Sequence, residues 1–149
     1  MSDKTDNGVP KLVDFGLAKI VGPNETADEP FGTLGYVAPE VLKKDPYSFS
    51  ADVWSLGCMI HALLSGSLPF DAEKSAETIK MTLEDPLVFT LPVMRALDST
   101  AKDLIQQLLK KKPNQRISLN NAIKHKWFDS VRETEQQQIE SHTWQTEEQ

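Results

Sequence analysis

One stretch of this 149-residue chain, from Ser50 to Ser65, limits the fold more than any other. Its apolar residues fall around most of the circumference of a helix, so the helix needs to be covered on most of its sides. They are Val53, Trp54, Leu56, Met59, Ile60, Leu63 and Leu64. Ser50 or a neighbour can cap the start, and Gly66 is a suitable stop. The pattern predicts a mainly α-helical domain packed around this central helix.

Shorter elements are predicted on either side of it. Helices are expected over 39–44, 72–84, 99–111 and 118–124. In the third of these, Thr100 and Asp103 have the spacing of a capping box, and the lysine run 110–112 is interpreted as a solvated helix end. A short strand is expected from Pro10 to Asp14, as part of a hairpin whose turn lies at residues 6–8. Residues 22–35 form a loop too long for a simple turn, and loops of that length are usually functional or mobile.

Charge and composition disfavour some classes of partner. The chain has 16 basic and 22 acidic residues, a formal net charge of −6, which argues against nucleic acid. Much of the acidic excess lies in a Gln/Glu-rich tail, residues 130–149. Cys58 is the only cysteine, which fits a reducing compartment. Because no stretch resembles a signal peptide or a membrane span, the cytoplasm or nucleus is the expected location and no membrane partner is expected.

Four motifs follow one another at informative spacings. Asp14-Phe15-Gly16 comes first, and Ala38-Pro39-Glu40 follows 24 residues after Asp14. Asp52-Val53-Trp54-Ser55-Leu56-Gly57 begins 12 residues beyond Glu40, and Arg116 comes later in Lys112-Pro113-Asn114-Gln115-Arg116. Each motif alone is weak, but the ordered set resembles the catalytic domain of eukaryotic Ser/Thr protein kinases. The segments 35–42 and 125–128 are most similar to its calcium/calmodulin-dependent group, including the calcium-dependent kinases.

The resemblance implies a partial C-terminal lobe of the α+β kinase fold over residues 1–129, followed by the tail 130–149. Asp14 matches the aspartate that holds Mg²⁺ against the nucleotide phosphates. Phe15 matches the apolar residue whose packing differs between active and inactive states, and Gly16 lets the backbone turn. Without the other motifs, Asp14 would be interpreted as an aspartate that ends a strand beside a glycine turn.

Residues 17–38 resemble the activation segment. Thr33, with Gly32 and Tyr36, matches the loop that receives the substrate residue after the phosphorylated Ser or Thr; the alternative is an ordinary loop threonine. Glu29 stands where many kinases have an activating phosphothreonine, so its carboxylate can pair with a basic group without phosphorylation. A solvated acidic loop explains Glu29 equally well, and Thr26 is a further candidate phosphorylation site.

Three residues match structural positions of the family. Glu40 and Arg116 match a buried ion pair that ties the activation segment to the helical core. Asp52 matches the helix aspartate that accepts hydrogen bonds from the catalytic-loop backbone. His61 and His125 belong to no metal-spaced cluster and are interpreted as structural.

Several parts of a working kinase are absent from these 149 residues. None of the seven glycines forms Gly-x-Gly-x-x-Gly, and none of the three histidines is followed by Arg-Asp. No segment matches the strand lysine that pairs with a helix glutamate. The expectation is therefore a fragment of a longer kinase whose complete form would use ATP and Mg²⁺, with weak or no binding of either by this chain.

Three functional hypotheses follow from the sequence. The chain is a piece of an active kinase, which acts on protein substrates and joins a missing N-terminal half. Alternatively, it is a non-catalytic binding module that docks substrates or competes with a full-length kinase. In the third case it has no independent function, because Val53, Leu56, Ile60 and Leu63 would be partly exposed without upstream helices, which predicts a marginal fold.

Overall fold

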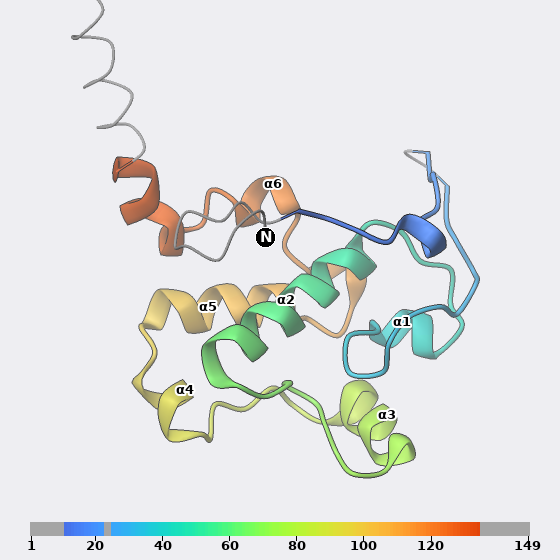
Figure 1. Cartoon of the computed structure of the whole chain (residues 1–149), viewed down its shortest axis with the longest axis horizontal. Helices are drawn as coiled ribbons and strands as arrows, with labels where there is room; N and C mark the ends of the chain where they lie inside the picture. The colour runs from blue at the N-terminus through green and yellow to red at the C-terminus, as the bar shows by residue number, and fades with distance from the viewer. Residues whose placement is uncertain (1–10, 23–24, 135–149) are drawn as a thin grey trace, which may run out of the picture.

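Helix α2, Ser50–Ser65, lies at the centre of the fold, with the other helices arranged around it (Figure 1). The computed structural model describes residues 11–22 and 25–134. Its longer helices are α2, α3 (Ser75–Glu84) and α5 (Ser99–Leu108). The short ones are α1 (Pro39–Leu42), α4 (Pro92–Ala96) and α6 (Leu119–Ala122), with single 3-10 turns at Phe15–Leu17, Pro113–Gln115 and Lys126–Phe128. The prediction of a mainly helical fold is confirmed.

Two clusters of buried side chains pack against different sides of α2. The first surrounds Trp54 and Cys58, which are fully buried with Phe70 and Ile105, and the second joins Val53 to α5 and α6. Helices α2 and α5 approach closely at Gly57, where an added Cβ would lie 2.8 Å from the side chain of Leu109. The central helix thus forms the core that its sequence predicts.

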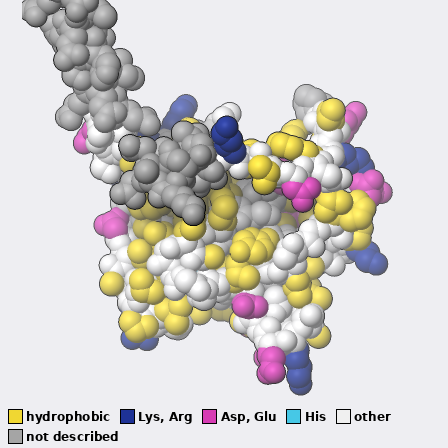
Figure 2. Space-filling model, in the orientation of Figure 1, with side chains coloured by type: hydrophobic (Ala, Val, Ile, Leu, Met, Phe, Trp, Pro, Cys, Tyr) yellow, Lys and Arg dark blue, Asp and Glu magenta, His cyan; other side chains and the backbone are white. Residues whose placement is uncertain are grey.

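One side of α2 stays open in the described part of the chain. Val53 is buried, Leu56 and Ile60 are partly buried, and Leu63 is 78% exposed. Beside them lies a wholly apolar groove of about 260 Å³ between α2, α5 and α6, lined by Leu56, Ile60, Leu104, Leu108, Leu119, Ala122, Ile123 and Phe128. Figure 2 shows hydrophobic side chains distributed over the face of the molecule that it presents. No described segment packs on this side. The expected exposure of Leu56, Ile60 and Leu63 is therefore observed, and the expectation is wrong for Val53, which is 3% exposed.

The predicted caps are partly wrong. Ser50 does not cap α2, because the chain enters the helix through a turn in which the amide of Ala51 donates to the carbonyl of Ser48, and Phe49 takes the N-cap position. In α5 the cap is Asp98, which accepts from both the amide and the hydroxyl of Thr100, so the proposed capping box is absent. Gly66 does end α2, with φ of 77° in the left-handed region.

The predicted strand from Pro10 to Asp14 is wrong for the residues that the structure describes. Residues 11–14 pair with no described segment, Asp14 is left-handed and Leu12 is 88% exposed, whereas a strand requires a partner for its hydrogen bonds. The hairpin turn at residues 6–8 lies outside the described residues. Between 11 and 134, gaps aside, the one β-type pairing is an isolated bridge of Ala27 with Tyr47.

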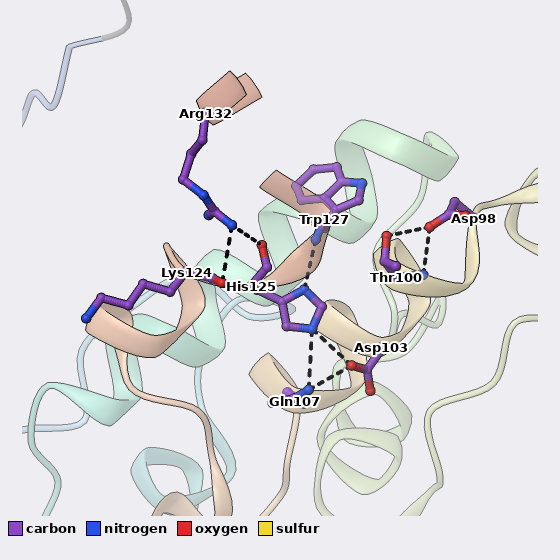
Figure 3. Close-up of polar contacts among 8 residues, drawn as sticks. All are labelled: Asp98, Thr100, Asp103, Gln107, Lys124, His125, Trp127 and Arg132. Atoms are coloured by element: carbon purple, nitrogen blue, oxygen red, sulfur yellow. Dashed lines mark hydrogen bonds and ion pairs between the residues drawn. The ribbon is translucent and has the colours of Figure 1, made fainter. Parts of the chain in front are cut away.

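The end of the described chain is anchored to α5 and α6 (Figure 3). The amide of Trp127 donates to Nδ1 of His125, so Nε2 carries the proton and donates to Asp103 at 2.9 Å. The guanidinium of Arg132 donates to main-chain carbonyls that follow α6. The shortest of these hydrogen bonds, to the carbonyl of Ile123, is 2.6 Å. Residues 129–134 are helical, so the acidic tail starts as a helix, and its residues from 135 lie outside the described part.

None of the helices between residues 11 and 134 is long and apolar enough to cross a membrane.

Candidate functional site

The candidate site is the segment from Asp14 to Glu40 where it crosses the first turns of α2. Its firmest attachment is an ion pair in which Arg116 donates to both carboxylate oxygens of Glu40, Nη1 to Oε1 at 2.8 Å and Nη2 to Oε2 at 3.0 Å. The side chains are 0% and 5% exposed respectively. Two parallel hydrogen bonds in a buried setting fix both position and orientation. The pair therefore holds α1 against the core, in agreement with the sequence prediction.

The remaining donors of Arg116 are also satisfied. Its Nε donates to the carbonyl of Lys110 at 3.1 Å, and Nη1 also donates to the carbonyl of Ser50. The guanidinium lies 5.3 Å from the ring of Trp54. A single side chain thus joins α1, the start of α2 and the segment after α5.

A tight turn precedes α1. The amide of Tyr36 donates to the carbonyl of Thr33 at 3.0 Å, and the hydroxyl of Ser55 on α2 donates to the carbonyl of Tyr36 at 2.9 Å. Gly35 has φ of 93°, and an added Cβ would lie 2.7 Å from Leu68. The turn therefore requires glycine for both its backbone and its space. Ser55 is a contact that sequence reasoning missed, and nothing in its spacing signals it.

A hollow of about 340 Å³ lies between this segment and α2. Residues from both sides line it, among them Gly32, Thr33, Tyr36, Asp52 and Ser55. Asp52, in the first turn of α2, has an exposed carboxylate at this wall and no hydrogen-bond partner among the described residues. The structure thus gathers four sequence-predicted residues, Gly32, Thr33, Tyr36 and Asp52, around one space.

Glu29 lies at the outer edge of the segment in an ion pair. Nζ of Lys19 donates to Glu29 at 2.6 Å, with both side chains 45% exposed. That hydrogen bond raises the pKa of Lys19 and lowers the pKa of Glu29. The hydroxyl of Tyr47 donates to the carbonyl of Glu29 at 2.7 Å, next to the bridge of Ala27 with Tyr47. Glu29 is therefore held at both its side chain and its backbone, which a freely solvated acidic loop would not be.

Asp14 lies apart from the hollow. Its backbone is left-handed, with φ of 62°, and its carboxylate accepts from the amide of Gly16 at 3.4 Å. Phe15 is 69% exposed. Mg²⁺ takes six oxygen ligands, and no group of three His, Cys, Asp or Glu side chains is placed to hold a metal within residues 11–22 and 25–134. Asp14 alone therefore does not form a metal site, although a carboxylate is the right ligand for this ion.

The lysine run after α5 differs from its prediction. Lys110 and Lys112 are exposed, but Lys111 turns inward, and its Nζ donates to the carbonyls of Met81 at 3.0 Å and Thr82 at 2.6 Å. The interpretation of all three lysines as a solvated helix end is wrong for Lys111. Because three lysines are adjacent, the sequence carries no signal that Lys111 is the partly buried one.

Comparisons with known proteins identify relatives. The family model described as the protein kinase domain matches residues 1–128. The chain is 40% identical over 135 residues to the serine/threonine-protein kinase fhkD of Dictyostelium discoideum, covering 83% of this chain and 18% of that protein. It is 40% identical over 118 residues to calcium-dependent protein kinase 25 of Arabidopsis thaliana, and the match covers 79% of this chain and 22% of that protein. It is 37% identical over 118 residues to serine/threonine-protein kinase 17A of Oryctolagus cuniculus, and the match covers 79% of this chain and 30% of that protein. The chain thus spans between 18% and 30% of the lengths of these relatives.

Proposed function

Because the chain belongs to the protein kinase domain family over residues 1–128, we propose that it provides the activation segment and helical core of a Ser/Thr-specific kinase. The complete enzyme would transfer the γ-phosphate of ATP to a Ser or Thr hydroxyl of a protein substrate. The observation that carries the proposal is the buried two-point contact of Glu40 with Arg116, which attaches the segment to α2.

The substrate would lie against the outer wall of the hollow. Thr33 and Tyr36 would contact the residue that follows the phosphorylated Ser or Thr, and Gly32 lets the chain turn there with φ of 138°. Ser55 supports this wall through the carbonyl of Tyr36. Because α2 holds this wall in place, the wall would orient a substrate without itself rearranging when the substrate binds.

ATP and Mg²⁺ belong to the complete enzyme in this proposal. Bound Mg²⁺ would offset the charge of the transferring phosphate, and the carboxylate of Asp14 would supply one of its oxygen ligands. The other ligands and the base that accepts the substrate proton must come from residues or groups other than those in this chain. The 149-residue chain by itself is accordingly expected not to catalyse phosphoryl transfer.

The ion pair of Glu29 with Lys19 bears on regulation. The carboxylate of Glu29 already forms an ion pair with Lys19 in the same segment, without a phosphate. In the unmodified protein this exposed pair would hold residues 19 and 29 together weakly, and phosphorylation of Thr26 would not be needed for that contact.

Intact mass spectrometry of the endogenous protein, captured with an antibody against residues 130–149, is the first test. The expected result is a mass well above 16.7 kDa, together with ATP- and Mg²⁺-dependent phosphorylation of Ser/Thr peptides. An Asp14→Asn change in the endogenous protein should abolish that activity, and the control change Asp71→Asn, at an exposed loop carboxylate, should not. Activity that survives Asp14→Asn would contradict the proposed role of Asp14.

A second function is favoured by one observation: the hollow is already walled by Thr33, Tyr36 and Asp52 in this chain alone. A chain of 149 residues that captures Ser/Thr peptides without phosphorylating them would be a substrate-docking module. Fluorescence anisotropy with labelled peptides tests this, with Gly35→Val as the variant that should disrupt the wall. Absence of saturable binding, or equal binding by Gly35→Val, would exclude the docking function.

A further inference from the structure

No large apolar side chain of helix α3 is fully buried, and Ile79, Met81 and Leu83 are each partly buried. The residues on its fully buried face are threonines, Thr78 and Thr82. Their hydroxyls bond locally: that of Thr82 donates to the carbonyl of Thr78 at 2.8 Å, and that of Thr78 accepts from the amide of Ala72 at 3.0 Å. Met81 is only partly buried against the core around Trp54. The hydrophobic effect therefore gives weak support to the position of this helix.

Lys111 supplies the attachment that α3 lacks. Its Nζ donates to the carbonyls of Met81 and Thr82, two of the last four in the helix. The last carbonyls of a helix commonly lack backbone partners, although that of Met81 also accepts from the amide of Asp85 at 3.1 Å. The negative end of the helix dipole attracts a cation. Lys111 thus caps α3 from a different segment, since it follows Met81 by 30 residues and Thr82 by 29 residues in the chain.

Aromatic rings complete the surroundings of the ammonium. Nζ lies 3.6 Å from the ring centroid of Phe70 and 5.4 Å from that of Trp54, and the two rings stack with centroids 5.7 Å apart. Cation–π contacts of this kind partly replace the lost hydration of the charge. The other charged or titratable groups that act on it are Asp85, which follows α3, and Cys58 on α2; Arg116 contacts the same Trp54 ring.

Two cations from one short segment therefore hold two neighbouring helices. Arg116 binds Glu40 on α1, and Lys111 binds the end of α3, while α1 and α3 pack against each other. We propose that Lys111 fixes the position of α3 on the core, as the counterpart of the contact that Arg116 makes with α1. This role lies outside the proposed phosphoryl transfer and holds whether or not the chain belongs to an active enzyme.

Hydrogen–deuterium exchange of the full 149-residue chain tests the proposal with two matched variants. Lys111→Met keeps the length of the side chain and removes its donors, and Lys110→Met makes the same change at an exposed neighbour. Amides of residues 75–85 should exchange about 10- to 100-fold faster in Lys111→Met, while those of α2 and α5 keep their protection. Lys110→Met should match the wild type throughout. Unchanged exchange in α3, or equal acceleration in all helices, would overturn the proposal.

A measurement on the wild-type chain covers the case in which Lys111→Met does not fold. Brief labelling of native lysine amines with acetic anhydride at pH 10.5 compares Lys111 with Lys110 and Lys112 by peptide mass spectrometry. At this pH an ordinary lysine is about half in its reactive free-amine form, so the lowered pKa of Lys111 can raise its labelling by no more than about twofold. The expected result is that Lys111 reacts at least about tenfold more slowly than either neighbour, because its amine is bonded and enclosed. Equal labelling of the three lysines would overturn the proposal by itself.

Discussion

Replacing Glu40 by Gln tests the attachment of the activation segment most directly. The change keeps the shape of the side chain and removes its charge, which leaves the guanidinium of Arg116 buried at 0% exposure without a counter-ion. Removing one partner of a buried ion pair costs about 3–5 kcal/mol. Because small domains are stable by only about 5–15 kcal/mol, this loss should remove a large part of the total.

Urea denaturation followed by circular dichroism at 222 nm measures the effect. Glu40→Gln should lower the midpoint strongly. Glu40→Gln combined with Arg116→Met should recover part of the loss, because no unpaired charge remains in the core. The control Glu29→Gln breaks an ion pair at the surface and should leave the midpoint close to that of the wild type. If Glu40→Gln unfolds at the same urea concentration as the wild type, the pair does not hold the segment.

Three further predictions concern other parts of the fold. Burial lowers the pKa of Lys111 from 10.5 to about 8, so between these values the unfolded chain binds more protons and the free energy of unfolding should rise with pH. The difference between wild type and Lys111→Met, measured by urea denaturation from pH 7.5 to 10.5, isolates that rise, and a constant difference would contradict it. Gly35→Ala should destabilise the chain by about 1–3 kcal/mol, and by more than Gly66→Ala. Of these two positions, only at Gly35 does the new Cβ meet a neighbour, Leu68 at 2.7 Å. Calorimetry would measure both losses of stability, and a larger loss for Gly66→Ala would refute the argument. Burial raises the pKa of Cys58 to about 12, so iodoacetamide at pH 8 should modify it in urea and not in the native chain; rapid native alkylation would show that the core opens.

The central helix and the ion pair were predictable from the sequence for different reasons. The apolar pattern of 50–65 specifies a buried helix by itself, and Gly66 marks its end. The contact of Glu40 with Arg116 spans 76 residues, and only the resemblance to a family suggested it. Long-range contacts of this kind have no local signature.

The errors have physical causes as well. A strand at 10–14 depends on a partner that local propensity cannot supply. The cap of α5 was assigned two residues late, at Thr100, because Thr100 and Asp98 are both good caps and only the backbone geometry selects Asp98. Helix α4, Pro92–Ala96, was not predicted.

The way in which Lys111 holds α3 has a consequence for sequence variation. The ammonium contacts main-chain carbonyls, which every amino acid possesses, and it makes no hydrogen bond to a side chain of α3. The outward residues of this helix can therefore change freely, provided that a helix still ends at the same place. Evolution can thus alter the surface chemistry presented by α3 while the contact that fixes the helix stays constant.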